Sequence, residues 1–169
     1  GLAWDRNILK LRSNTLDQDT SGRIRGNHDA GPLAFGSDGK LFVIIGDQNQ
    51  RSQLQNLPDG PGCVSAPCPA IPQGGQPDDQ FGGPEPDDAH FTGVIVRLND
   101  DGTTPTDNPF YDAGAAIGGA AGANIQKIYA YGIRNSYGLN FDPLSGDLWE
   151  NENGDDTFSE LNRVEPGMN

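Results

Sequence analysis

Apolar residues occur along this chain in short runs that are separated by clusters of Gly, Pro, Asp and Ser. The runs Leu-Phe-Val-Ile-Ile at 41–45 and Val-Ile-Val at 94–96 are too short for helices and are typical of buried strands. No stretch keeps a helical period of apolar positions over three turns, which favours a β-rich fold. The predicted strands are 7–12, 32–35, 41–46, 92–99, 126–131, 137–142, 147–151 and 161–165.

Two of the predicted hairpins share a pattern. Residues 33–47 contain Leu-Ala-Phe, a turn with Gly, then Leu-Phe and a final Gly-Asp, and residues 139–155 contain Leu-Asn-Phe, a turn with Gly, then Leu-Trp and a final Gly-Asp. Repeated antiparallel units of this kind are typical of β-propeller blades, although the same strands could also form a β-sandwich. We predict an all-β fold in which the chain supplies about two to three propeller blades, because a blade needs roughly 40–50 residues. Such a propeller would be incomplete at both ends.

Two long segments interrupt the strands. Residues 48–90 are rich in Pro, Gly, Gln and Asp, and residues 105–123 are rich in Gly and Ala. Loops of this length are uncommon in compact domains and are often functional. The run 113–123 contains helix-forming alanines, but its glycines favour a flexible loop. We predict that both segments are loop insertions on one β scaffold that spans residues 1–169.

The charge of the chain limits its partners. Asp and Glu number 24 against 11 Lys and Arg, which gives a formal net charge of −13 at pH 7. Phosphate backbones and anionic membranes attract basic surfaces, so we exclude nucleic-acid binding, and no apolar run approaches the roughly 20 residues of a membrane span. Cys63 and Cys68 are either two free thiols or a small loop disulfide, and a disulfide would indicate an oxidising compartment.

His28 precedes a predicted strand and lies among small, turn-forming residues, where an imidazole can reach a cavity. There it is a candidate general base, and a base needs a partner that orients its ring. Asp47 follows the next predicted strand and could return to the same end of the hairpin to hold that ring. The alternative is a solvated loop histidine, which the spacing does not exclude.

Arg134 and Asn135 lie in a tight connection between two predicted strands that carry aromatic residues. A guanidinium offers a rigid fork for an anion or a developing oxyanion, and a structural salt bridge is the alternative. Farther along, residues 150–156 and Glu160 are dense in carboxylate and amide oxygens, the ligands that Ca²⁺ prefers. Gly154 permits a sharp turn in that segment, while a solvated acidic loop explains the same composition.

Several ordered stretches resemble the soluble sugar dehydrogenases that depend on pyrroloquinoline quinone (PQQ), the glucose/sorbosone dehydrogenase family. These stretches are 31–47, 97–110, 128–135, 138–143 and 160–169. The resemblance, to the middle portion of the domain, implies a six-bladed β-propeller of four-stranded antiparallel sheets with PQQ and Ca²⁺ as cofactors. It also implies oxidation of an aldose or related sugar at C1 by hydride transfer to PQQ, in which the cofactor does the redox chemistry and the protein supplies position and charge.

The resemblance also implies roles for individual residues. His28 matches the catalytic base, which also contacts PQQ, and Asp47 matches the carboxylate that orients it. Arg134 and Asn135 match a pair that contacts PQQ, where the arginine would stabilise charge on a quinone oxygen. Tyr137 stands where the family has a glutamine that contacts the cofactor.

Two calcium roles follow from the same resemblance. Gly154 and Asp155 match the residues whose carbonyls hold the Ca²⁺ that polarises PQQ, and Asp155 replaces a proline of the family. Glu160 resembles a carboxylate of a structural calcium site.

The resemblance further implies a bacterial periplasmic or secreted protein that oxidises a small sugar and passes electrons to an unidentified acceptor. The cationic residues that hold the PQQ carboxylates in later blades of the family lie outside these residues, so we expect the isolated chain to be inactive. The alternative is a non-catalytic calcium-binding propeller that binds a carbohydrate or a protein partner. The joint presence of His28, Asp47, Arg134 and Asn135 favours the enzyme.

Overall fold

The computed structural model of the chain describes residues 5–9, 28, 31–47, 91, 93–154 and 158–168. The predicted insertion at 48–90, with Cys63 and Cys68, lies outside the described residues. None of the helices described is long and apolar enough to cross a membrane.

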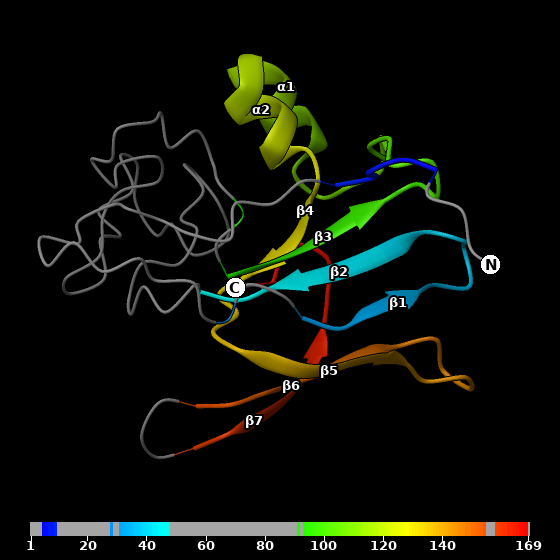
Figure 1. Cartoon of the computed structure of the whole chain (residues 1–169), viewed down its shortest axis with the longest axis vertical. Helices are drawn as coiled ribbons and strands as arrows, with labels where there is room; N and C mark the ends of the chain where they lie inside the picture. The colour runs from blue at the N-terminus through cyan, green and yellow to red at the C-terminus, as the bar shows by residue number, and fades with distance from the viewer. Residues whose placement is uncertain are drawn as a thin grey trace, which may run out of the picture.

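A four-stranded sheet and a three-stranded sheet, both antiparallel, form the described fold (Figure 1). Within each sheet, every strand pairs with its neighbour along the chain, so that the orders are β1–β2–β3–β4 and β5–β6–β7. The first sheet contains β1 (Leu33–Phe35), β2 (Leu41–Ile45), β3 (Val94–Leu98) and β4 (Ile128–Tyr131). The second sheet contains β5 (Ser136–Phe141), β6 (Leu148–Glu152) and β7 (Glu160–Val164).

The predicted strands from residue 32 onward are confirmed, with ends that differ by one or two residues. The two repeated segments form the hairpins β1–β2 and β5–β6, as their shared pattern predicted. The predicted strand at 7–12 is not found, because residues 7–9 form no strand and the rest of that stretch lies outside the described residues.

Both hairpins turn through an Asp and a Gly. Asp38 Oδ1 accepts a hydrogen bond from the backbone N–H of Lys40 at 3.0 Å, and Gly39 has a φ of 75°. Asp142 and Gly146 have the same roles in the β5–β6 turn, where Gly146 has a φ of 79°. A carboxylate that bonds the backbone two residues on, followed by a glycine in the left-handed region, explains why these segments reverse direction.

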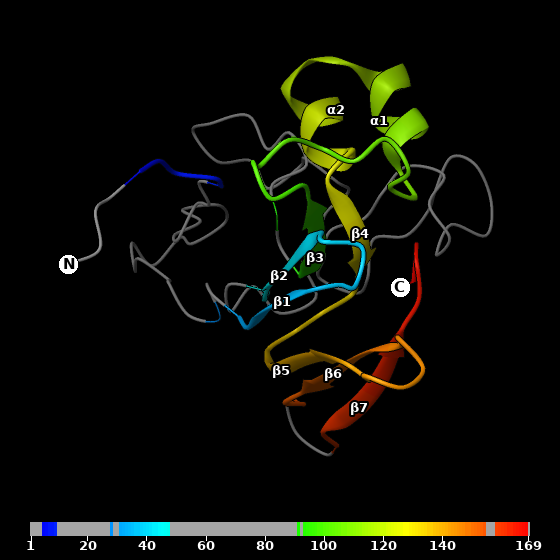
Figure 2. The same cartoon turned by 90° about the vertical axis from the view of Figure 1, so that its right-hand side faces the viewer.

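The four-stranded sheet is apolar on both faces, and each face has its own core. One face packs on residues that precede β3 and on the helical segment before β4, and its cluster is Ile45, Phe91, Val94, Val96, Phe110, Ile125, Ile128 and Tyr131. The other face packs against the three-stranded sheet, and its cluster is Phe42, Ile44, Ile95, Ala130, Ile133, Leu139, Leu148 and Val164. Figure 2 shows the resulting order of layers: helices, four-stranded sheet, three-stranded sheet.

The prediction of a flexible loop at 113–123 is wrong, because the segment forms α1 (Tyr111–Ile117) and α2 (Gly119–Ile125). The glycines allow the two helices to pack closely. A side chain on Gly122 would overlap the carbonyl oxygen of Gly114, and one on Gly114 would approach the carbonyl oxygen of Gly122 to 2.5 Å. The glycines therefore serve close packing, and the fold is β-rich with one helical pair rather than all-β.

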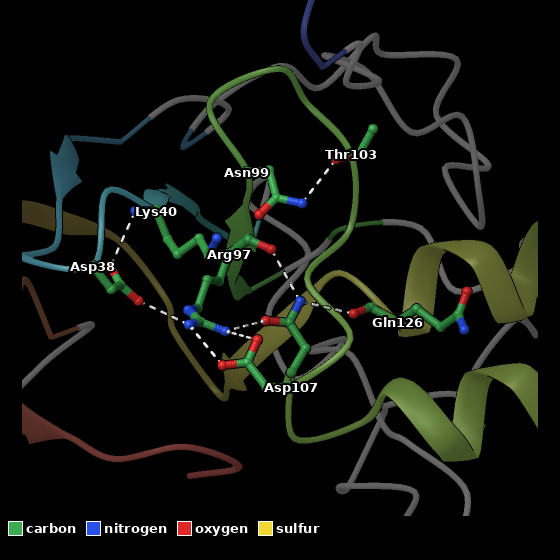
Figure 3. Close-up of polar contacts among 8 residues, drawn as sticks. Asp38, Lys40, Arg97, Asn99, Thr103, Asp107 and Gln126 are labelled. Carbon is green, nitrogen blue, oxygen red and sulfur yellow. Dashed lines mark hydrogen bonds and ion pairs between the residues drawn. The ribbon is translucent and has the colours of Figure 1, made fainter.

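A buried arginine ties the β1–β2 turn to the base of the helical segment (Figure 3). The Arg97 guanidinium donates to Asp38 at 2.8 Å and to both oxygens of Asp107, at 2.9 and 3.1 Å. Asn108 accepts another of its hydrogen bonds and donates in turn to the carbonyl oxygen of Gln126 at 2.9 Å. The hydrogen bond from Arg97 lowers the pKa of the Asp107 carboxyl. These bonds lie at the end of the four-stranded sheet where β3 ends, opposite the residues predicted to be functional.

Candidate functional site

Several strand ends meet at one edge of the molecule, and they carry the residues predicted to be functional. Asp47 follows β2, and Arg134 and Asn135 lie in the connection from β4 to β5. The backbone N–H of Asp47 donates to the carbonyl oxygen of Arg134 at 2.8 Å, and the N–H of Gly93 donates to that of Gly46 at 2.9 Å. Backbone hydrogen bonds therefore fix the connection against the end of β2.

His28 and Asp47 meet at this edge. His28 Nδ1 lies 2.6 Å from Asp47 Oδ1, and the two side chains are 11% and 3% exposed. A neutral imidazole that shares its Nδ1 proton with a carboxylate presents Nε2 as a proton acceptor. The contact with Asp47 fixes the orientation of the ring, and the burial of His28 does not fit a solvated loop histidine.

The backbone segments around this pair approach each other closely. His28 has a φ of 62°, the left-handed region that non-glycine residues rarely adopt. A side chain on Gly46 would lie 2.6 Å from the carbonyl oxygen of His28 and 2.7 Å from that of Arg134. Gly46 thus allows the segment of His28 and the segment of Arg134 to approach β2 from two sides, and strain of this kind is common at functional sites.

Arg134 is held by residues at the end of β6. Its Nη1 donates to the carbonyl oxygen of Asn153 at 2.7 Å, and its backbone N–H donates to Oε2 of Glu152 at 2.7 Å. The backbone N–H of Asn153 donates to the carbonyl oxygen of Asn135 at 2.9 Å. The arginine that sequence reasoning singled out is therefore fixed at both its backbone and its guanidinium.

Asn135 and Tyr137 also lie together. The Asn135 side chain is buried, and its Nδ2 donates to the Tyr137 hydroxyl oxygen at 3.1 Å. Tyr137 is 70% exposed, so its ring extends from the edge while its hydroxyl contacts the buried amide. Of these two residues, which were each predicted to contact a cofactor, Asn135 is buried and Tyr137 is exposed.

Of the predicted calcium residues, Gly154 and Glu160 lie in the part of the chain that the structure describes. Gly154 follows β6, and its carbonyl oxygen accepts a hydrogen bond from Nδ2 of Asn153 at 3.2 Å. Glu160 is exposed on β7 and accepts from Nδ2 of Asn162 at 3.2 Å, while Asp155 lies outside the described residues. No group of three or more His, Cys, Asp or Glu side chains arranged to hold a metal is found among the residues described.

Sequence reasoning assigned no separate role to two carboxyls of β6, the buried Glu150 and the half-buried Glu152. Glu150 is 1% exposed, and Asn162 donates to its Oε1 at 2.7 Å. Its Oε2 has no hydrogen-bond partner of good geometry within the described ranges, although the Ser136 hydroxyl lies close enough to oppose part of the pKa rise that burial causes. Burial likewise raises the pKa of Glu152, against the hydrogen bond from Arg134. In the sequence, the position of Glu150 and Glu152 at alternate residues of one strand was the signal that both side chains lie on the same face.

Comparisons with known proteins identify the family of this chain. Residues 10–169 match the family described as glucose/sorbosone dehydrogenase. The chain is 31% identical over 144 residues to the aldose sugar dehydrogenase YliI of Escherichia coli (strain K12), which covers 85% of this chain and 28% of that protein. It is 32% identical over 144 residues to quinoprotein glucose dehydrogenase B of Acinetobacter calcoaceticus, covering 85% of this chain and 25% of that protein.

A solved structure of the aldose sugar dehydrogenase of Streptomyces coelicolor in its PQQ-bound form is also similar. The TM-score is 0.51 at 26% sequence identity, and the match covers 83% of this chain and 29% of that one. The chain thus spans between a quarter and a third of the length of these relatives. With a family match over 10–169 and relatives above 30% identity, the chain belongs to the glucose/sorbosone dehydrogenase family.

Proposed function

We propose that this protein oxidises an aldose or related sugar at C1, with PQQ as the hydride acceptor and Ca²⁺ as a second cofactor. The observation that carries this proposal is the His28–Asp47 pair at 2.6 Å beside the fixed Arg134. Family membership supports an oxidoreductase that acts on sugars. The two antiparallel sheets support the proposal that the chain supplies two to three blades of a six-bladed β-propeller.

The chemistry of the donors at this edge fits the cofactor. PQQ carries carboxylates and quinone oxygens, which guanidinium and amide N–H groups recognise. Arg134 and Asn135 would supply such donors, with the Tyr137 hydroxyl beside Asn135. Ca²⁺ accepts backbone carbonyl oxygens as ligands, and we propose those of Gly154 and Asp155 for it, with Glu160 at a separate structural calcium site.

In the proposed reaction, bound PQQ would take up the hydride of the sugar C1–H bond. His28 would accept the proton of the C1 hydroxyl at Nε2, so that C1 becomes the carbonyl carbon of a lactone. Asp47 would hold the imidazole and stabilise its positive charge while the proton stays there. Arg134 would stabilise negative charge on a quinone oxygen. The two electrons would leave to an external acceptor, which regenerates the cofactor.

Binding of PQQ, with and without Ca²⁺, is the first test. We expect the protein in its full natural length to show Ca²⁺-dependent absorbance of the bound quinone, and the 169-residue chain to show little or none. The His28→Ala variant should lose turnover by about 10² or more, with little change in PQQ affinity. Unchanged turnover would remove His28 from the mechanism, and activity indifferent to a chelator would remove calcium.

A non-catalytic propeller is the second candidate function, and Tyr137 is the observation that favours it. Its exposed ring stands where the family has a glutamine, and its hydroxyl contacts Asn135, one of the proposed cofactor ligands. The absence of PQQ binding by the full-length protein would favour this candidate. Binding of a carbohydrate or a protein partner would then be the property to measure.

A further inference from the structure

The backbone N–H and C=O of Arg134 join the two sheets at the edge that carries His28 and Asp47. Its carbonyl oxygen accepts the backbone N–H of Asp47, which belongs to the end of the four-stranded sheet, at 2.8 Å. Its N–H donates to Glu152 Oε2, at the end of the three-stranded sheet, at 2.7 Å. One residue thus receives a contact from each sheet.

The position of Glu152 in the fold brings its carboxylate to this contact. It is the last residue of β6, where its backbone is paired with Ser136 on one side and Glu160 on the other. Its side chain is half-buried and contacts the β4–β5 connection. The carbonyl oxygen of the next residue, Asn153, accepts a hydrogen bond from the Arg134 guanidinium. A carboxylate that accepts a backbone N–H makes one of the stronger kinds of hydrogen bond in proteins.

We propose that Glu152 is a positioning residue of this site. It holds the backbone of Arg134 through its N–H. Through that backbone it sets the direction of the Arg134 guanidinium and the position of Asp47 beside His28. Glu152 contacts the site through the backbone N–H of Arg134, so its effect passes through Arg134. The inference rests on the proposed function only for its consequence on cofactor binding.

Two substitutions distinguish the hydrogen bond that Glu152 accepts from the packing of its side chain. Glu152→Gln keeps a side-chain carbonyl oxygen that can accept the Arg134 N–H, whereas Glu152→Met has similar length and no such acceptor. Glu165→Met is the matched control, because Glu165 is an exposed carboxylate that pairs with Arg163 after β7, away from the site. The variants are compared in the protein in its full natural length.

Three readouts apply. The first is hydrogen exchange of the Arg134 amide, which in the wild type should be about 100-fold slower than in an unstructured chain. The second is the proton NMR signal of the hydrogen bond between His28 Nδ1 and Asp47. The third is the dissociation constant for PQQ in the presence of Ca²⁺, in which a misplaced Arg134 should cost about tenfold or more.

We expect Glu152→Met to lose the amide protection, to broaden or shift the His28 signal and to weaken PQQ binding, while Glu152→Gln stays within about threefold of the wild type in PQQ affinity. A wild-type Arg134 amide that exchanges at the unstructured rate would overturn the proposal, and this measurement does not depend on any variant folding. Agreement of Glu152→Met with Glu165→Met in all three readouts would also overturn it. If the wild type binds no PQQ, the proposed function fails, and the amide and His28 signals still decide the role of Glu152.

Discussion

At Gly46 the backbone has no room for a side chain. Two carbonyl oxygens, those of His28 and Arg134, lie 2.6 and 2.7 Å from where a Cβ atom would be placed. Neither oxygen belongs to a flexible side-chain end, so the backbone itself must move if a methyl group is added. Gly46→Ala should therefore lower the free energy of unfolding by about 2–3 kcal/mol, measured by urea denaturation.

Gly39→Ala serves as the comparison for that variant. Gly39 has a φ of 75°, and nothing lies within 4 Å of its added Cβ atom. The cost there is only the left-handed backbone, about 1 kcal/mol. Gly46→Ala should also disturb the NMR signal of His28, which Gly39→Ala should leave unchanged. Equal losses of stability with an undisturbed His28 signal would contradict the close approach.

The Glu150 carboxyl makes stability depend on pH in a defined direction. Burial raises its pKa, so the folded protein holds this proton more tightly than the unfolded chain does. The contribution is favourable at acid pH, and it is lost as the pH rises from the ordinary carboxyl pKa through the raised pKa of Glu150. Glu150→Gln should therefore be more stable than the wild type at neutral pH, by about 1 kcal/mol or more.

The measurement is urea unfolding of both proteins at several pH values. The difference in stability between the two proteins at each pH isolates the effect of Glu150. Other carboxyls have a pKa shift in the opposite direction, such as Asp107, whose pKa is lowered by Arg97. The stability advantage of Glu150→Gln should grow with rising pH and vanish in acid. An advantage that is the same at every pH would mean that burial does not raise the pKa of Glu150.

At the scale of elements, strands were predictable and the helical pair was not. Each strand contains its own signal, because alternating or continuous apolar residues between turn residues define it locally, as in 41–45 and its Asp38-Gly39 turn. The close contact of Gly114 with Gly122 exists only once two helices pack, so a glycine that permits packing looks the same in sequence as one that prevents a helix.

The same distinction applies to the site. His28 and Asp47 could be paired from the sequence because both flank the β1–β2 hairpin, whose register brings its open end together. Glu152 could not be assigned to Arg134, because the contact joins the end of β6 to a connection that only the packing of the two sheets brings near. Local patterns thus predict hairpin neighbours and miss contacts between sheets.

The helical pair gives a prediction at the same scale. Gly122→Ala places a methyl group on the carbonyl oxygen of Gly114, although alanine has the higher intrinsic helix propensity. We expect α1 and α2 to separate, with faster amide exchange in both helices and a loss of about 2 kcal/mol in stability. Ala116→Gly, at an exposed position of α1, is the control for propensity and should cost about 1 kcal/mol. A more stable Gly122→Ala variant would contradict the close packing.

At the scale of the whole molecule, the two sheets end in strands that carry exposed apolar side chains. On β1, Leu33 and Phe35 are 62% and 58% exposed, and on β7, Leu161 is 69% exposed. Among the strands that the structure describes, β1 and β7 each lie at an edge of their sheet. Edge strands with apolar side chains favour strand pairing between molecules. We therefore expect the 169-residue chain to associate as its concentration rises, as measured by sedimentation velocity.

Charged substitutions test this expectation. Phe35→Lys combined with Leu161→Lys should reduce association, because a lysine on an edge strand opposes pairing. Leu144→Lys is the control, since Leu144 is 96% exposed in the β5–β6 turn and lies on neither edge strand. Equal reduction by the control would attribute association to total apolar exposure rather than to the edges.

The left-handed backbone of His28 has a consequence for how this position would respond to selection. At a φ of 62°, glycine and asparagine are accommodated more easily than histidine. A library randomised at residue 28 and screened only for resistance to heat should return those two residues. The same library screened for turnover should return histidine alone. The residue at position 28 would therefore show whether a protein had been selected for catalysis or only for a stable fold.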